Sequence, residues 1–494
     1  MRMLRVQRYT HYFILGVMAY LSLAYYIHFR SPQSVEWTPQ TGTGQFSHST
    51  PVSIQEKDVI RNMSMWQKTT DHMRLTDVSN YHRTDVQLPL FFEKENINNI
   101  KLGKIKFESV EFQNVEHIYV YAAFLDKRIQ NKTYTRIFAL QRITNLEGLL
   151  CRFHLGENKE SVVTVYTEKY EMCENHGKGY GGYIYSCQVP ELIHETPTTV
   201  SLSTYSTNFA QSSPPLTMNL TPLQPNSNSD SQLSFFGVCV PPIFGNIPLS
   251  ILIQYIELTK ILGGSKLFFY KYNVSKSVEK LLKYYTAKGD IHVLNWHLPP
   301  GVNAFNIWYN GQLLAIQDCL YRNMAAFKFL LFTDLDEILI PRQANNWITM
   351  LHNIALKSEH NLSNMDDIAG FSFQSVFFGP NQEPDPGQTL QFLQRRDRTK
   401  ITSKIRSKLL IQPSHVFELG IHHMSRPIRD NITVMSVDPD EALLHHYRSC
   451  VRSFDANMKC YPQIRDDTIL KYADLLNART RSVMLDVLNL LKQS

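Results

Sequence analysis

The chain has 494 residues and a nearly balanced charge, with 50 lysine and arginine residues against 44 aspartate and glutamate residues and a formal net charge of +6. This length leaves room for two or three domains, and a hydrophobic content of 43% is ordinary for a globular protein. We expect no nucleic-acid partner, because the positive charge is concentrated only in the short group Arg395, Arg396 and Arg398.

The N-terminal segment predicts a membrane anchor. Basic residues precede an apolar run without charge, so we expect a cytosolic tail at residues 1–8, a membrane-spanning helix at 9–29 and a lumenal location for the rest of the chain. A cleaved signal peptide is the alternative, since residues 22–24 (SLA) provide a small-x-small site. The polar segment 30–105 is expected to be a stem that holds the globular part away from the membrane.

Residues 106–232 predict a small β-rich domain that ends in a linker. Runs of β-branched and aromatic residues recur at 118–121, 137–140 and 161–166, with turn residues between them. A polar stretch with several prolines, residues 211–231, then indicates a linker or a long loop.

From residue 233 to residue 494 the pattern changes to strands that alternate with helices. Such alternation predicts an α/β fold with a mostly parallel sheet and helices on both of its faces. The expected strands are 235–240, 266–270, 291–296, a run that begins at 329 and ends at the acids 334 and 336, 370–378 and 408–411, and the expected helices are 248–262, 276–285, 312–324 and 466–492.

Two carboxylates, Asp334 and Asp336, stand where the apolar strand beginning at Phe329 runs out. Ligands of open α/β sheets bind beyond the carboxyl ends of the strands, so we expect a ligand-binding or catalytic site here. Alternate residues of an extended backbone share a direction, and two acids held close together favour a cation between them. Oxygen ligands suit Mg²⁺ or Mn²⁺ carrying a substrate diphosphate. The alternative is that both acids cap the next segment or pair with basic residues.

Cysteines and glycosylation signals agree with a lumenal location. Seven cysteines in an oxidising compartment predict disulfides with at least one thiol left over, and Cys450 with Cys460 is the most local pairing. Glycosylation is expected at the sequons of Asn62, Asn131, Asn273, Asn361 and Asn431.

Six ordered motifs resemble those of glycosyltransferase family 92. They are residues 120–128 (VYAAFLDKR), 239–245 (CVPPIFG), 311–320 (GQLLAIQDCL), 334–337 (DLDE), 420–422 (GIH) and 446–448 (HYR). The resemblance spans roughly residues 116–450 and departs from the family at Lys127, where we expect an acidic residue; this change concerns packing or acceptor contacts more than the metal.

The resemblance implies a Golgi type II membrane enzyme on a GT-A type, Rossmann-like fold. Such enzymes transfer galactose from UDP-galactose, with inversion, to the fucose of an N-glycan core, and they use Mn²⁺. The partners expected for this chain are therefore a nucleotide-sugar, a glycan acceptor and, through the N-terminal helix, the membrane.

The resemblance also implies roles for individual residues. Asp334 and Asp336 would hold the metal, with a histidine chosen from His422, His423, His445 and His446, of which His422 and His446 fall in the motifs. Asp336 and Glu337 are the expected catalytic carboxylates, with Glu337 the first candidate for the base and Glu383 and Asp385 as alternatives. Residues that could contact the nucleotide are Asp318, Arg322 and Lys408, and aromatic residues that could stack on sugars are Trp296, Trp308, Tyr309, Phe377 and Phe378.

Two other functions fit parts of the pattern. Residues 333–339 also resemble the first motif of haloacid-dehalogenase-type phosphatases, in which the first aspartate is a nucleophile. Those enzymes carry the motif on the first strand of the domain, whereas about three expected strands precede it here. A membrane-anchored glycan-binding protein without activity is the third possibility, and the pair of acids argues against it because a lectin needs no diphosphate site.

Overall fold

The structure is a computed structural model that describes residues 105–155, 161–206 apart from 192 and 194, 215–223, 233–357, 367–379, 388–449 and 464–492. No helix within these residues is long and apolar enough to cross a membrane. The predicted anchor and nearly all of the predicted stem lie outside the described residues. The same holds for Asn62, Asn361, Glu383, Asp385, Cys450 and Cys460.

The large sheet is mostly parallel, as predicted for this part of the chain. Antiparallel pairs occur where β19 meets β15 and β17, and where β16 meets β23. The strands in spatial order are β1 (Glu108–Val110), β14 (Ile291–Trp296), β13 (Lys266–Val274), β12 (Ser234–Gly245), β15 (Phe327–Phe332), β19 (Ser403–Ile411), β17 (Ile368–Phe377), β23 (Ala442–His446) and β16 (Glu337–Pro341), with β22 (Thr433–Ser436) also paired to β17.

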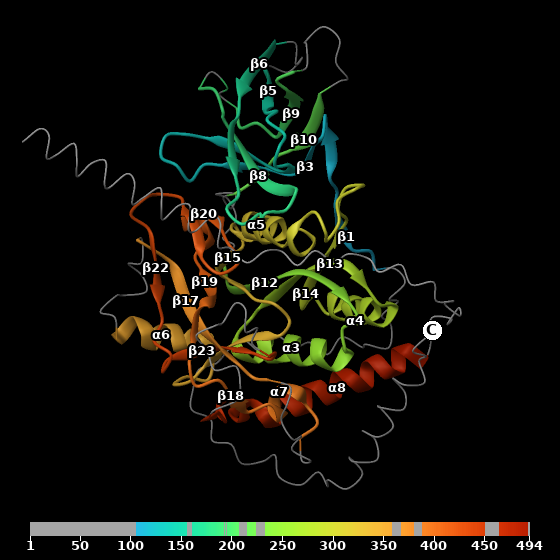
Figure 1. Ribbon diagram of the computed structural model, residues 1–494, viewed down its shortest axis with the longest axis vertical. Coiled ribbons are helices and arrows are strands. Elements are labelled where there is room, and N and C mark those ends of the chain that lie inside the picture. Colours follow the sequence, from blue (N-terminus) through green and yellow to red (C-terminus); the bar gives the residue numbers. More distant parts are fainter. Residues whose placement is uncertain are drawn as a thin grey trace, which may run out of the picture. The chain divides into compact units, whose positions relative to one another are not determined.

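Helices cover both faces of the large sheet, as Figure 1 shows: α5 lies on one side, and α3, α4 and α8 lie on the other. The sequence sets the ends of α3, because Pro248 precedes the helix and Gly263 ends it with φ 117°, a left-handed conformation that favours glycine. The helices are α3 (Leu249–Leu262), α4 (Lys276–Ala287), α5 (Gln312–Asn323), α6 (Trp347–Lys357), α7 (Gln391–Gln394) and α8 (Ala473–Lys492), with short 3₁₀ turns η3 (Trp308–Asn310), η5 (Pro413–His415) and η6 (Thr468–Tyr472).

The β-rich region consists of two sheets packed face to face, both antiparallel apart from the short parallel pair of β11 with β3. One sheet is formed by β11 (Thr221–Pro222), β3 (Ile118–Asp126), β4 (Tyr134–Arg142), β8 (Tyr180–Gln188) and β7 (Glu168–Glu171), with β2 (Gln113–Val115) on β3. The other is formed by β10 (Leu216–Asn219), β9 (Thr199–Thr204), β5 (Leu149–Leu155) and β6 (Ser161–Tyr166). Two further pairs are β18 (Asp397–Arg398) with β24 (Ile464–Arg465), and β20 (Val416–Leu419) with β21 (Met424–Pro427).

Helix α5 joins the β-rich region to the large sheet. The outer face of β3 and β4, which carries Phe124 and Phe138, packs against Tyr321 of α5, with ring centroids 5.5 and 4.7 Å away. The same apolar cluster includes buried residues of the large sheet such as Leu330. The sheet containing β3 and β4 is therefore buried on both faces, which explains why these strands are almost continuously apolar.

Two disulfides lie in buried positions, in agreement with the expected oxidising compartment. Cys151 of β5 is bonded to Cys187 of β8, and Cys239 of β12 is bonded to Cys319 of α5. Cys173 is a free, exposed thiol. Each bond connects two packed layers, so both reinforce the stacking of sheet on sheet or helix on sheet.

The three described sequons lie on the surface. Asn131, Asn273 and Asn431 are exposed, so each could be reached by the glycosylation machinery, and their modification stays a prediction.

The motif at residues 126–128 forms a structural ion cluster. Asp126 is fully buried and accepts hydrogen bonds from Arg128 Nε at 2.9 Å and from Arg136 Nε at 3.1 Å. Burial raises the pKa of Asp126, but the two guanidinium groups outweigh burial and hold it below its usual range. Arg128 also donates to the Val416 carbonyl at 2.7 Å, which ties the β-rich region to β20.

Lys127, where the sequence departs from the family pattern, points out of this ion cluster. It is exposed and its Nζ donates to Thr196 Oγ1 at 3.1 Å. The departure therefore leaves the buried contacts of Asp126 and Arg128 intact.

Replacing Asp126 tests the ion cluster. We expect Asp126→Asn to lower the free energy of unfolding by about 3–5 kcal/mol, because two buried guanidinium groups lose their counter-charge. Urea unfolding followed by fluorescence measures the change. The matched control, Lys127→Ala, should stay within about 0.5 kcal/mol of the wild-type protein. An Asp126→Asn variant as stable as the wild type would contradict the structural role.

Candidate active site

The two acids of the DxD motif lie in a tight turn between β15 and β16. The turn is closed by a hydrogen bond from the Glu337 backbone N–H to the Asp334 carbonyl at 3.1 Å. Thr333, just before it, is held by the hydroxyl of Tyr255 from α3 at 2.7 Å. We expected an extended backbone here, with both acids pointing the same way. The turn instead gives Asp334 and Asp336 different partners, so this part of the prediction was wrong.

A buried lysine neutralises the first half of the turn. Lys408 Nζ, from the neighbouring strand β19, lies 3.0 Å from Asp334 Oδ2 and 3.3 Å from Glu337 Oε2. Burial lowers the pKa of Lys408, but the two carboxylates outweigh it and raise that pKa above its ordinary value, so the ammonium stays charged. Burial raises the pKa of Glu337 even though Lys408 opposes it. Glu337 Oε2 also accepts from the Asp334 backbone N–H at 3.1 Å.

A histidine holds the second half of the turn. His446 of β23 is paired in register with Glu337, and its Nε2 lies 3.3 Å from Asp336 Oδ2. Its ring stacks on Phe377 with centroids 5.1 Å apart. Burial raises the pKa of Asp336, but the hydrogen bond from His446 and the charges of His446 and Arg448 lower it below its usual range. Asp336 is therefore ionised, and its side chain is 43% exposed.

His422 lies beside the same cluster as a neutral imidazole. Its Nδ1 is 3.0 Å from the Ser407 carbonyl, so we assign the proton to Nδ1 and leave Nε2 as an acceptor. Burial and the nearby charge of Lys408 lower the pKa of His422 to about 3. An imidazole fixed in this tautomer by a backbone carbonyl is the usual form of a metal-ligating histidine.

The other two histidine candidates lie elsewhere. His423 is exposed and faces Glu174 at 3.7 Å. His445 is buried between Phe378 and Tyr447, and burial lowers its pKa to about 3. Of the four histidines, the structure brings only His422 and His446 to the acidic turn.

The available donors suit a divalent ion on the Asp336 side of the turn. Within the described residues, no three His, Cys, Asp or Glu side chains are grouped closely enough to hold a metal by themselves. Asp336 and His446 nevertheless form an adjacent carboxylate–imidazole pair through Nε2, while Nδ1 of His446 is buried without a hydrogen bond and faces Glu337 Oε1 at 3.4 Å. Lys408 already fills the space between Asp334 and Glu337. Carboxylate oxygen and neutral imidazole are donors that Mn²⁺ accepts.

Asp318 and Arg322, expected to face the nucleotide, form a buried ion pair on α5. Arg322 Nε and Nη2 donate to the two oxygens of Asp318 at 2.9 and 3.0 Å, and Tyr270 donates to Asp318 at 2.6 Å. Arg322 also reaches Glu108 of β1 at 3.1 Å. These contacts fasten α5 to the edge of the large sheet. The expected role in nucleotide binding stays a prediction without a contact that supports it.

Most of the aromatic candidates for sugar stacking belong to the core. Trp296, Phe377 and Phe378 are buried, and the indole N–H of Trp296 donates to a backbone carbonyl. Trp308 is half-buried and packs on His176. Tyr309 is 53% exposed and has φ 40°, an unusual value for a tyrosine.

Two residues near the turn were not assigned a role from the sequence. Gln312, in the first turn of α5, donates from Nε2 to Asp334 Oδ1 at 3.3 Å. Arg448 follows His446 at the end of β23 and is close enough to lower the pKa of Asp336. Both lie within motifs that carried the family resemblance, and that was the signal that could have found them.

A mostly parallel α/β sheet whose central strand ends in a partly exposed acidic turn belongs to the class of α/β proteins that bind ligands at the carboxyl ends of their strands. The model of glycosyltransferase family 92 matches residues 234–480, half of the chain. The chain belongs to glycosyltransferase family 92 and is a glycosyltransferase, as the ordered motifs predicted. Family membership also decides against the phosphatase reading of residues 333–339.

Two Caenorhabditis elegans proteins are similar in sequence. "Beta-1,4-galactosyltransferase galt-1" is 26% identical over 376 residues, which cover 75% of this chain and 81% of that protein. "Glycosyltransferase family 92 protein F13G3.3" is 28% identical over 131 residues, 25% of this chain and 26% of that protein.

Among solved structures, two crystal structures of S. aureus TarS match with TM-scores of 0.23 and 0.24 at 13% and 14% identity. The matches cover 43% and 44% of this chain and 60% and 37% of those chains. These TM-scores are too low to support any conclusion about a shared fold or function.

The buried ammonium of Lys408 can be tested by removing it. We expect Lys408→Met to cost about 3–5 kcal/mol of unfolding free energy, because Asp334 and Glu337 lose their shared counter-charge. Adding Glu337→Gln to this variant should recover part of the loss, since the amide needs no cation. Denaturant titration measures both effects.

The control is Lys404→Met, which removes an exposed lysine from the same strand and should change stability by less than about 0.5 kcal/mol. Equal losses for the Lys404 and Lys408 variants would show that the buried ion contacts do not stabilise the turn.

Proposed function

We propose that the chain transfers galactose from UDP-galactose to a hydroxyl group of a glycan, such as the fucose of an N-glycan core, with inversion at the sugar carbon and with a divalent metal. The similar protein named a beta-1,4-galactosyltransferase, aligned over 75% of this chain, supports the sugar and the linkage. A GT-A type arrangement of the large sheet is part of this proposal.

The observation that carries the proposal is the acidic turn after β15. Asp334 and Asp336 are 37% and 43% exposed, although they lie among buried residues at the rim of a parallel sheet. Both can therefore touch a bound ligand, as a metal–diphosphate site requires. We propose that Asp336 and His446 hold Mn²⁺, with Asp334 and His422 completing the donors from this chain. The ion would stabilise the negative charge that develops on the UDP leaving group.

The buried residue Glu337 holds the acidic turn in place. Glu337 is 1% exposed, and its oxygens face Lys408, His446 and the backbone N–H of Asp334. These contacts support a role for Glu337 in fixing the turn, and its burial keeps it from the hydroxyl of an acceptor. Of the two expected catalytic carboxylates, Asp336 and Glu337, only Asp336 is exposed enough for a substrate to reach. Arg448, beside it, supplies a positive charge suited to a phosphate.

We also propose that the catalytic part lies in the Golgi lumen behind an N-terminal anchor. The two buried disulfides support an oxidising compartment, where such bonds form and persist. The basic and apolar pattern of residues 1–29 supports the anchor.

A panel of donors tests the reaction. Full-length protein in detergent would be incubated with a core-fucosylated N-glycan, Mn²⁺ and, in separate reactions, UDP-galactose, UDP-glucose or UDP-N-acetylglucosamine. We expect transfer of a single hexose from UDP-galactose, detected as a mass increase of the glycan, and loss of transfer when EDTA removes the metal. Full transfer in EDTA would contradict the metal, and transfer from another donor alone would contradict the sugar.

The role of Asp336 is tested by nucleotide binding. Asp336→Asn should weaken Mn²⁺-dependent UDP binding on the order of 100-fold, because a neutral amide is a poor ligand for a divalent ion. Isothermal titration calorimetry measures this, and a melting curve checks that the variant is folded. Asp440→Asn, which changes an aspartate with 85% exposure away from the turn, should bind UDP like the wild type. Wild-type affinity in Asp336→Asn would remove its assigned role.

A further inference from the structure

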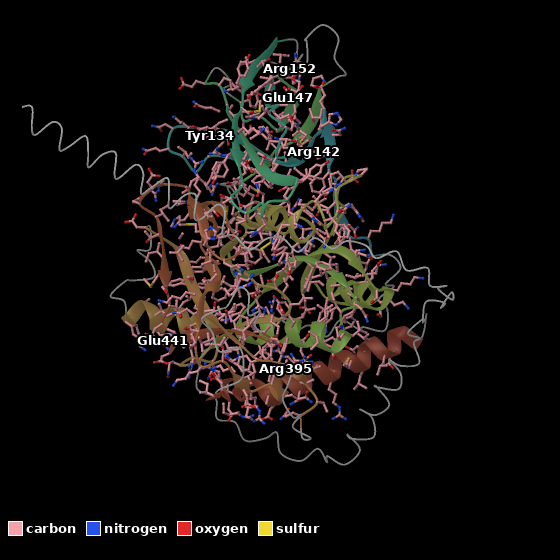
Figure 2. The ribbon with its side chains drawn as sticks, in the orientation of Figure 1. Tyr134, Arg142, Glu147, Arg152, Arg395 and Glu441 are labelled. Atoms are coloured by element: carbon pink, nitrogen blue, oxygen red, sulfur yellow. A yellow bond between two sulfur atoms is a disulfide. The ribbon has the colours of Figure 1, made fainter. Side chains whose placement is uncertain are left out.

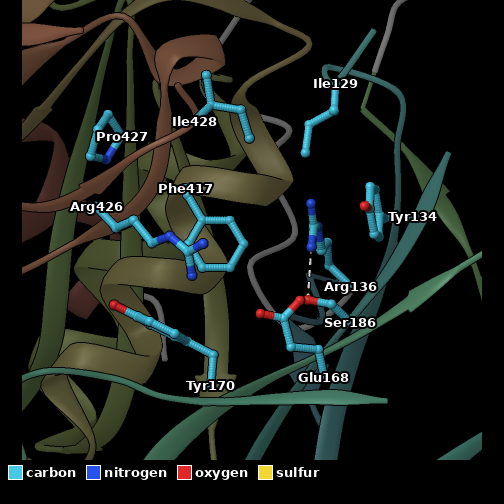
Figure 3. Close-up of a pocket in the computed structure, with 10 residues that line it drawn as sticks. All are labelled: Ile129, Tyr134, Arg136, Glu168, Tyr170, Ser186, Phe417, Arg426, Pro427 and Ile428. Carbon is cyan, nitrogen blue, oxygen red and sulfur yellow. Dashed lines mark hydrogen bonds between the residues drawn. The ribbon is translucent and has the colours of Figure 1, made fainter. Parts of the chain in front are cut away.

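A second pocket lies between the β-rich region and the β20–β21 hairpin, away from the acidic turn (Figure 3). Its volume is about 120 Å³. Strands β4, β7 and β8 form one wall, and the hairpin forms the other. The side chains that matter here are Tyr134, Arg136, Glu168, Tyr170, Phe417 and Arg426.

Aromatic rings and guanidinium groups alternate along the wall of the pocket. Phe417 lies between two arginines, with Arg136 Cζ 5.1 Å and Arg426 Cζ 4.6 Å from its ring centroid. Tyr170 packs edge-on against Phe417 at 5.3 Å, and Arg136 lies over the ring of Tyr134 at 4.2 Å. Phe417 is only 5% exposed, so the apolar surface left for a ligand belongs to the half-buried rings of Tyr134 and Tyr170, beside the guanidinium groups that cover part of them.

Some polar groups of the pocket are already used by the fold. Arg136 is bound to Asp126 and donates to Ser186 Oγ at 2.7 Å, the bond drawn in Figure 3. The Tyr170 hydroxyl donates to Glu418 at 2.7 Å. These residues build the wall and have little left to offer a ligand.

Three other polar groups lining the pocket are not used in this way. The hydroxyl of Tyr134, the carboxylate of Glu168 and the guanidinium of Arg426 make no hydrogen bond or ion pair with any described residue. Strand pairing places Glu168 opposite Ser186 and thus on the face of the sheet that carries Arg136. An acceptor, a donor and a hydroxyl therefore surround the apolar rings without partners of their own.

We infer that this pocket binds one sugar residue of the acceptor glycan, at a distance from the sugar that receives the transferred hexose. Sugar rings have apolar faces that pack on aromatic side chains and hydroxyl groups that pair with carboxylates and guanidinium groups. This inference rests on the proposed glycosyltransfer and adds a subsite to it.

The hairpin links this subsite to the acidic turn. Arg426 and His422 belong to the same hairpin and are four residues apart, so their Cα atoms are separated by no more than about 14 Å. An oligosaccharide can bridge such a distance. The subsite should therefore matter for extended acceptors and not for short ones.

Acceptor kinetics test the subsite. We expect Arg426→Ala and Glu168→Gln each to raise KM for a core-fucosylated N-glycan by about 10-fold, equivalent to about 1.4 kcal/mol, and to change kcat less than twofold. Transfer to methyl fucoside, which cannot reach the pocket, should be unchanged. The control Arg429→Ala removes an exposed arginine just beyond the hairpin that does not line the pocket. Melting curves check folding.

Glycan binding without nucleotide separates this inference from the proposed reaction. The same N-glycan, fluorescently labelled, should bind the wild-type protein and bind Arg426→Ala about 10-fold more weakly, even if no UDP-sugar is a donor. Absence of transfer by the wild type with weakened binding in the variant would refute the reaction alone. Wild-type glycan affinity and wild-type KM in both variants would overturn the subsite.

Discussion

Lys408 of β19 reaches the turn that joins β15 to β16 and lies between Asp334 and Glu337, and the arrangement of the active site follows from the way these three charges balance. The ammonium group lies 3.0 and 3.3 Å from the two carboxylates and is 2% exposed. Without it, two acids at a sheet rim would repel each other or take up a proton. With it, the turn is rigid and carries Asp336 outward, ionised and braced by His446. Asp336 is thus left on the side of the turn that Lys408 does not neutralise.

The strand order explains why these charges meet. Strand β19 enters the sheet antiparallel between β15 and β17, and this pairing brings Lys408 next to the acidic turn although 74 residues separate it from Asp334. Strand β23 runs beside β16 in register, which places His446 opposite Glu337. The antiparallel pairs thus supply the side chains that complete the site, while the parallel strands provide the frame on which it is built.

Local patterns predicted the elements well and their long-range partners poorly. Helix ends at Pro248 and Gly263 followed from capping chemistry, and the strand expected at 291–296 has those bounds. Asp318 and Arg322 illustrate the limit, because helical spacing revealed that they could pair but not that Asp318 would be fully buried. The turn at Asp334 was missed because the alternating acids suggested an extended backbone where the strand ends, whereas β15 ends at Phe332 and β16 begins at Glu337. Which strands become neighbours depends on the packing of whole layers, and this leaves little trace in a local pattern.

The β-rich region belongs to the active site in a physical sense, because hydrogen bonds between it and the β20–β21 hairpin hold the segment that carries His422. Glu418 of β20 is fully buried and accepts hydrogen bonds from the Tyr170 hydroxyl at 2.7 Å and the Cys173 backbone N–H at 2.8 Å. Glu174 accepts from the backbone N–H of Ile421 at 2.6 Å. Since a buried carboxylate without these donors would be costly, the hairpin keeps its position only while the β-rich region is docked. Recognition of an acceptor on that region and placement of an imidazole at the acidic turn therefore depend on the same hydrogen bonds.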